Sequence, residues 1–157
     1  MSDENQYDDQ EFMRATINEV FADVSTPIDA KDYDNAYIKV GSVKFYNGVS
    51  DKGRVWKRVS MYFVIDDQEQ REKTNIENPG AGYGFFLDLT EDGKSLETGP
   101  NRNTDLGALR KALKQEAAPW SFEQLDGAGP VRIRVAHEVN DQNPEKKRAV
   151  VRSVTKQ

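Results

Sequence analysis

Residues 54 to 65 have the sequence RVWKRVSMYFVI, and their alternation decides the interpretation of the whole chain. One parity is mostly apolar: Val55, Lys57, Val59, Met61, Phe63 and Ile65. The other parity holds two arginines and two amphipathic aromatic residues: Arg54, Trp56, Arg58, Ser60, Tyr62 and Val64. A period of two predicts a β-strand with one buried and one solvated face. The solvated face has the composition that stacks bases and binds phosphates.

The preceding segment, NAYIKVGSVKFYNGV at residues 35 to 49, predicts the first strand of a long β-hairpin that turns at residues 50 to 53. Its apolar side chains change parity near Gly41, and a bulge there would keep all of them on the core side. They are Ile38, Val40, Val43 and Phe45. The bulge would turn a second set of side chains outward, beside Trp56 and Arg58. This set is Lys39, Ser42, Lys44 and Tyr46.

Lys57 interrupts the apolar parity of the second strand. A bulge near Lys57 would move Trp56 to the buried face, so the sequence leaves open whether Trp56 is exposed or lies in the core. With Trp56 buried, the aromatic residues left for stacking in this hairpin are Tyr46 and Tyr62.

The segment that follows predicts a loop and then a third strand. Residues 66 to 82 are polar and acidic and end in NPGAG, which is typical of a long exposed loop. Four alternating residues then point inward: Tyr83, Phe85, Leu87 and Leu89. Phe86 and Asp88 lie on the outer side, where Asp88 would repel a phosphate.

A helix and two strands complete the predicted domain. Thr104 is expected to cap the helix, which ends before Pro119. Its apolar stripe is Leu106, Leu109, Leu113 and Ala117, and Trp120 and Phe122 follow as lids over the edge of the core. The fourth strand, VRIRVAHEV at residues 131 to 139, places Arg132 and Arg134 opposite its apolar side, and RAVVRSVT is the last strand.

The charge is distributed unevenly along the chain, whose net charge is −5. Residues 1 to 35 contain ten acidic and two basic side chains, whereas residues 36 to 65 contain six basic and one acidic. Residues 130 to 157 contain seven basic and three acidic side chains. The positive charge therefore lies in the predicted strands, and the net value does not argue against a nucleic-acid ligand.

Residues 1 to 34 form an acidic N-terminal arm. Residues 1 to 10 have almost no apolar content, so we expect them to be disordered. We expect a short helix capped by Asp8 or Asp9, ending before Pro27. Thr16, Ile17, Val20 and Val24 would also suit a strand. The arm is either a solubilising tail or a segment that competes with nucleic acid or docks a partner.

The composition argues against several classes of protein. Without Cys, neither a disulfide framework nor a thiolate zinc site can form. No apolar run approaches the length of a membrane span, and the acidic N-terminus does not resemble a secretory signal, so we expect a soluble, cytoplasmic protein. His137 shares the parity of Val135 and Val139, and no Ser or Thr is spaced to form a nucleophile with it. We therefore expect neither an enzyme nor a bound metal or cofactor.

Three segments resemble the phage-encoded type of OB-fold single-stranded DNA-binding protein. They are VGSVKFYNGVSDKGRVWKRVSMYFVI, NTDLGALRKAL and SFEQLDGAGPVRIRV, within a resemblance that covers residues 36 to 155. It implies a mainly β fold over residues 35 to 157: a five-stranded antiparallel OB-fold barrel with a helix between the third and fourth strands. It also implies a protein that protects single-stranded DNA in replication, recombination or repair, in the host cytoplasm if phage-encoded.

Many proteins of this type recruit replication partners through an acidic C-terminal tail. The present chain ends in SVTKQ, and its acidic stretch is N-terminal. The segment that would bind replication or recombination proteins is therefore residues 1 to 11.

Ten side chains are expected to bind nucleic acid: Lys39, Lys44, Tyr46, Arg54, Trp56, Arg58, Tyr62, Phe86, Arg132 and Arg134. The cations would neutralise phosphates, and the aromatic rings would stack bases with little sequence preference. Single-stranded RNA stays open as the ligand, since stacking ignores the sugar. An OB-fold protein-interaction module that uses the arm or the 66 to 82 loop also stays open, as does a homodimer.

Overall fold

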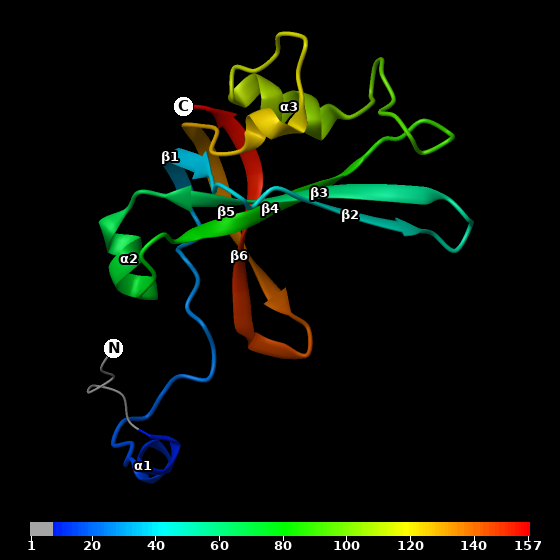
Figure 1. Ribbon diagram of the computed structural model, residues 1–157. Helices are drawn as coiled ribbons and strands as arrows, with labels where there is room; N and C mark the ends of the chain where they lie inside the picture. Colours follow the sequence, from blue (N-terminus) through cyan, green and yellow to red (C-terminus); the bar gives the residue numbers. More distant parts are fainter. Residues whose placement is uncertain (1–7) are drawn as a thin grey trace.

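The computed structural model describes residues 8–157, which form a mainly β fold, as predicted (Figure 1). The strands are β1 (Asp32–Ile38), β2 (Lys44–Val49), β3 (Val55–Ile65), β4 (Gly80–Leu87), β5 (Val131–Asn140) and β6 (Asn143–Lys156). The helices are α1 (Asp9–Arg14), α2 (Gln68–Thr74) and α3 (Thr104–Ala112), with a 3-10 turn at Phe122–Leu125. The predicted helix before the last two strands is confirmed as α3, but the predicted cap is wrong, because Asn103 and not Thr104 is the N-cap residue.

Five of the six described strands close into a ring. The hydrogen-bonded order is β1-β5-β6-β4-β3-β2, and an additional pairing of β1 with β3 closes it. β2 lies outside the ring and extends as a hairpin with β3. β4 and β6 run parallel where Gly82 lies opposite Val150, so the expected purely antiparallel sheet is wrong. A ring with an odd number of strands cannot reverse direction at every neighbour, and one parallel pair is unavoidable.

The inward faces of the strands form one hydrophobic core, as the alternation predicted. The buried strand residues include Val59, Met61, Phe63, Ile65, Phe85, Leu87, Val131, Ile133, Val135, Val151 and Val154. α3 lies over one end of the ring (Figure 1) and buries Leu106, Leu109 and Ala112. Burying each large apolar side chain stabilises the fold by roughly 1.5–3 kcal/mol. The ring therefore holds the outer faces of its strands in fixed positions.

The first predicted strand is divided into β1 and β2 by a turn at residues 39–43. Gly41 adopts a left-handed φ of 79°, which a residue without Cβ tolerates. The turn stays attached to β3, because the Lys39 N–H donates to the Tyr62 carbonyl oxygen over 2.8 Å. Val40 is 71% exposed, so its predicted place in the core is wrong. The turn redirects the chain where a single bulge would have kept Val40 inward.

The segment from 66 to 82, expected to be a structureless loop, contains helix α2 and the start of β4. Asp67 caps the helix by accepting the Gln70 N–H over 3.1 Å, and Asn75 ends it with a φ of 57°. Gln70 is fully buried; its Nε2 donates to Asp29 Oδ2 (2.8 Å) and its Oε1 accepts the Asp29 N–H (2.9 Å). The loop prediction was wrong because this helix buries a polar side chain, which apolar periodicity cannot detect.

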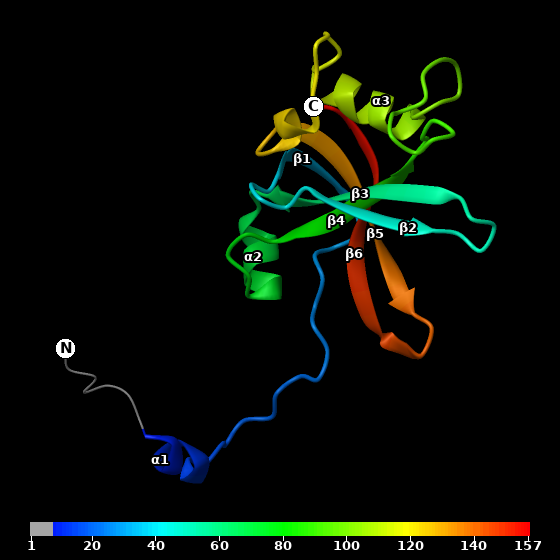
Figure 2. The same cartoon turned by 45° about the vertical axis from the view of Figure 1, so that its right-hand side comes forward.

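Residues 8–27 of the acidic arm stand away from the ring (Figures 1 and 2). A short helix capped by Asp8 is present as α1, where Asp8 accepts an N–H of the first turn over 2.7 Å. It ends at Arg14, and residues 15 to 27, expected to continue it or to form a strand, are in neither. The chain returns to the core at Ile28, which is 2% exposed, so packing begins before the boundary expected at residue 34. The disorder expected for residues 1 to 10 falls largely on residues 1–7, which lie outside the described residues.

α3 ends earlier than predicted. It stops at Ala112, and Lys114 adopts a left-handed φ of 60° just beyond it. Ala117, expected on the apolar stripe of the helix, is exposed outside it. Trp120 and Phe122 pack against the core, as predicted for lids over its edge.

Candidate nucleic-acid interface

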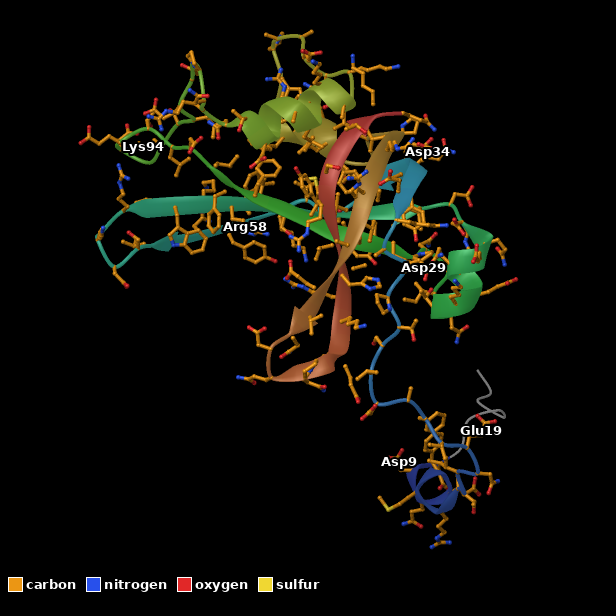
Figure 3. The ribbon with its side chains drawn as sticks, turned by 180° about the vertical axis from the view of Figure 1, so that it is seen from behind. Asp9, Glu19, Asp29, Asp34, Arg58 and Lys94 are labelled. Carbon is orange, nitrogen blue, oxygen red and sulfur yellow. The ribbon has the colours of Figure 1, made fainter. Side chains whose placement is uncertain are left out.

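The outer face of β3 brings basic and aromatic side chains of three strands together. Register places Tyr46 of β2 and Phe86 of β4 on either side of Arg58. Two residues further along, Lys44 lies opposite Ser60. Figure 3 shows Arg58 between the β2–β3 hairpin and the crossing of β5 and β6. The alternation of residues 54 to 65 thus places these basic and aromatic side chains on one continuous surface.

Trp56 lies half-buried on this outer face, because β3 pairs without a bulge around Lys57. Its indole packs edge-on against Phe86, with ring centroids 5.7 Å apart. It also covers Gly48, where an added Cβ would come within 2.4 Å of the ring. Lys57 points to the opposite side, with Nζ 5.6 Å from the Phe45 ring centroid. Trp56 therefore supports the hairpin and offers part of its surface to a ligand.

Phe86 is the more accessible ring of this pair, with 61% of its surface exposed. The guanidinium carbon of Arg58 lies 5.4 Å from its centroid, within range of a cation–π interaction. The neighbouring Asp88 carboxylate accepts the Asn103 N–H over 2.7 Å, which ties it to the loop before α3. The Phe86 ring thus has the Arg58 guanidinium beside it, and the nearby Asp88 carboxylate is bonded to the loop before α3.

A groove of about 550 Å³ runs along β2, β3 and the segment after α2; we call it the β2–β3 groove. Its lining includes Lys39, Lys44, Tyr46, Ser60, Tyr62 and Gly82. Tyr46 is 52% exposed, and Tyr62 is half-buried. Burial raises the pKa of the Tyr62 hydroxyl, although a hydrogen bond with the Gly80 backbone opposes this shift. The groove therefore combines two tyrosine rings with two lysines.

A second groove of about 540 Å³, the β4–β6 groove, continues from the first. Its lining includes Arg58, Tyr62, Gly82, Glu138, Arg148 and Arg152. Ser60, Tyr62 and Gly82 line both grooves. The two grooves consequently form one track across the outer faces of β2, β3, β4 and β6.

Glycines occupy alternate positions 80, 82 and 84 of β4, and Gly82 and Gly84 line the track. A Cβ on Gly80 would lie 1.8 Å from the Phe63 carbonyl oxygen, so Gly80 is required by close backbone approach. A Cβ on Gly84 would lie 2.6 Å from Nη2 of Arg58, which crosses over it. A Cβ on Gly82 would meet no atom within 4 Å. Packing therefore does not require glycine at position 82, where the floor of the track is open.

Arg148 and Arg152 are groove residues that the sequence analysis did not identify. Both lie on β6, and they pair with Glu138 of β5. The signal was present, because Arg148 and Arg152 share one parity of the last predicted strand, opposite to that of the buried Val151. What the sequence could not provide was the parallel pairing that brings β6 beside β4.

Arg132 and Arg134 lie on a different face. Arg132 Nη2 is 3.1 Å from Asp32 Oδ2, and Arg134 Nε is 3.0 Å from Asp32 Oδ1. Hydrogen bonds from Arg134 and then Arg132 lower the pKa of Asp32. Asp34 adds a second carboxylate 3.8 Å from Arg132, and Figure 3 shows Asp34 far from Arg58. The structure therefore does not bring these two predicted residues to the track.

The ten predicted side chains thus fall into separate groups. Five line the track: Lys39, Lys44, Tyr46, Arg58 and Tyr62. Trp56 and Phe86 form a ring pair at its edge, next to Arg58. Arg54 is exposed at the turn of the β2–β3 hairpin, where its N–H donates to Ser50 Oγ over 3.1 Å.

His137 is half-buried and makes a structural hydrogen bond. Its Nε2–H donates to the Ile28 carbonyl oxygen over 2.7 Å, because a carbonyl can only accept. This bond holds the end of the arm against β5. Within residues 8–157, no group of three or more His, Cys, Asp or Glu side chains is placed to hold a metal ion.

Comparison with known proteins does not assign this chain to a family. No model of a known protein family matches it, and a search of curated proteins finds no match. In the described part of the chain, no helix is both long enough and apolar enough to cross a membrane. Function must therefore be argued from the track itself.

Proposed function

We propose that this protein binds single-stranded DNA, with little sequence preference, along the track formed by the two grooves. The observation that carries the proposal is that the grooves share Gly82 and join basic side chains from three regions with aromatic side chains. The cations are Lys39, Lys44, Arg58, Arg148 and Arg152. The aromatic residues are Tyr46 and Tyr62, with Phe86 beside Arg58.

The chemistry of the track suits an unpaired strand. Its cations would follow the phosphate backbone, while bases stack on the tyrosine rings for about 1–3 kcal/mol each. Every base has an aromatic face, so stacking discriminates little between sequences. A duplex hides those faces within its own stack and would use only the cations.

We also propose that the ringed sheet is an OB fold. The support is the ring of five strands, with α3 between β4 and β5, and the way β1 and β2 together pair along β3 as one interrupted strand. With this assignment β3 and β4 are the second and third strands, whose outer face binds oligonucleotides in OB folds. The track lies on that face.

A fluorescence anisotropy titration with a labelled oligo-dT tests the proposal. We expect binding at low salt that weakens with a slope of about −3.5 in log affinity against log salt, if all five track cations neutralise phosphates. The variants Trp56→Ala and Arg54→Gln with Arg58→Gln locate the binding face. No binding at low salt, or equal affinity for a duplex of the same length, would overturn the proposal.

The choice of DNA over RNA rests on the resemblance to single-stranded DNA-binding proteins. Phosphate contacts and stacking are available to both polymers. Competition between oligo-dT and oligo-U of equal length measures the preference directly. Tenfold stronger competition by RNA would change the ligand class while leaving the track as the binding site.

A second candidate function, protein binding by the acidic arm, is favoured by the arm's exposed apolar side chains. They include Met13, Ile17, Val20 and Phe21. We expect deletion of residues 1 to 24 to remove binding to a replication or recombination protein, while Trp56→Ala leaves it intact. The opposite pattern would show that such a partner uses the track instead.

A further inference from the structure

A carboxylate lies among the arginines of the β4–β6 groove. Glu138 Oε1 accepts hydrogen bonds from Nη2 (2.6 Å) and Nε (3.2 Å) of Arg148. Nη2 of Arg152 lies 3.7 Å from Glu138 Oε2. Arg58 lines the same groove from β3. Both carboxylate oxygens thus face guanidinium groups, with a third arginine nearby.

The position of Glu138 is unusual on this track. Of the described residues that line the two grooves, it is the one acidic side chain. Guanidinium groups bind carboxylates and phosphates with the same two-oxygen geometry. A carboxylate placed between arginines therefore occupies the kind of site that a phosphodiester would take.

The ion pairs around Glu138 are accessible and exchangeable. Side-chain exposures are 75% for Arg148, 54% for Arg152 and 40% for Glu138. Exposed ion pairs are weak, so a competing anion can replace the carboxylate at little cost. The hydrogen bond from Arg148 lowers the pKa of Glu138, and the charges of Arg148, Arg152 and Arg58 add to this effect. Glu138 is therefore charged at neutral pH.

We propose that Glu138 is an internal competitor for a phosphate site formed by Arg58, Arg148 and Arg152. In the free protein its carboxylate occupies the site. When a single strand enters the track, a phosphodiester replaces the carboxylate on the arginines, and Glu138 turns to solvent. This inference rests on the proposed function and deepens it, because Glu138 would set how tightly the strand is held and how fast it leaves.

The main test compares Glu138→Gln with Glu145→Gln, a control with the same charge change on the exposed part of the same β5–β6 hairpin. For Glu138→Gln we expect about three- to fivefold tighter binding of labelled oligo-dT at low salt, the range of an exposed ion pair. The salt slope should steepen by about 0.7, because one more net positive charge meets the strand. Glu145→Gln should change the affinity less than twofold.

A second set of variants shows whether Glu138 acts through its arginines. The gain from Glu138→Gln should disappear in a background in which Arg148→Gln and Arg152→Gln are both present. Glu138→Asp keeps the negative charge but places the carboxylate farther from the arginines, so it should give part of the gain in affinity. Thermal melting followed by circular dichroism checks the fold of each variant.

The outcomes separate the inference from the function on which it rests. Equal affinities of Glu138→Gln and Glu145→Gln, or a gain that persists without the two arginines, would overturn the inference while the wild-type protein still binds. Absence of binding by the folded wild-type protein would instead overturn the proposed function, and the competitor role with it.

Discussion

Two faces of the ringed sheet carry outward arginines but differ in what lies across the strands. On the β1–β5 face, Arg134 forms an ion pair with Asp32, at 3.0 Å. On the β3–β4 face, Arg58 lies between Tyr46 and Phe86. Alternation places an arginine outward in both cases. The neighbours across the sheet then decide what a ligand meets, because Arg58 lies beside aromatic rings that can stack bases, whereas Arg134 lies beside a carboxylate that repels phosphate.

The largest expected effect on binding comes from filling the floor of the track. The β1–β5 face is not part of this track. Gly82→Leu places a side chain where the two grooves meet, and no atom lies within 4 Å of its Cβ. We expect the affinity for oligo-dT to fall about tenfold or more, the cost of losing at least one stacked base. Anisotropy titration measures it, and melting should show an intact fold.

Two other glycines provide controls for Gly82→Leu. Gly107 lies on the exposed side of α3, and Gly107→Ala should leave binding unchanged and stabilise the helix by up to about 1 kcal/mol. Gly80→Ala should instead destabilise the fold, since its Cβ would lie 1.8 Å from a carbonyl oxygen. If folded Gly82→Leu binds oligo-dT with unchanged affinity, the junction of the two grooves is not part of the binding site.

The next effect separates the two arginine faces directly. Arg58→Gln should weaken oligo-dT binding about three- to tenfold at low salt and reduce the salt slope by about 0.7, because one phosphate contact is lost. Arg134→Gln should leave both quantities nearly unchanged, since Arg134 lies on the β1–β5 face and does not line the track. Titrations at several salt concentrations give both numbers. A greater loss for Arg134→Gln would transfer the binding site to the β1–β5 face.

A smaller effect is expected from releasing the masked arginines. Asp32→Asn combined with Asp34→Asn removes the carboxylates that face Arg132 and Arg134. We expect about twofold tighter, more salt-dependent binding, because a second basic surface becomes available at the edge of the sheet. The control is Asp51→Asn in the β2–β3 turn, which removes one of the two negative charges that the double variant removes. If the double variant equals this control, masking by carboxylates does not distinguish the two faces.

The smallest effect concerns stability in acid. Hydrogen bonds from Arg134 and Arg132 lower the pKa of Asp32 from its ordinary value of 3.8. Its stabilisation is therefore complete above that value and is lost as the pH falls through the lowered pKa of the folded state, because the unfolded chain takes up the proton first. Melting temperatures between pH 6 and the acid range should decline less steeply for Asp32→Asn than for wild type. Parallel curves would contradict the assignment.

The comparison of the β3–β4 face with the β1–β5 face also shows which parts of the candidate site the sequence predicts. The outward positions of Lys44, Tyr46 and Arg58 follow from alternation and from hairpin pairing, which are local. Arg148 was missed because it reaches the track through strand pairings that the sequence does not specify. Gly82 was missed as well, because a residue with no side chain matters here for the space it leaves.

The sequence by itself determined the alternation of β3 to β5, the presence of α3 and the basic, aromatic character of β3, because these depend on periodicity within a few residues. Only the tertiary structure decided that Gln70 could be buried in a helix against Asp29. It also decided which arginines are available, since Asp32 and Arg132 lie 100 residues apart in the chain. Such pairings depend on how the ring closes, and no local pattern encodes that closure.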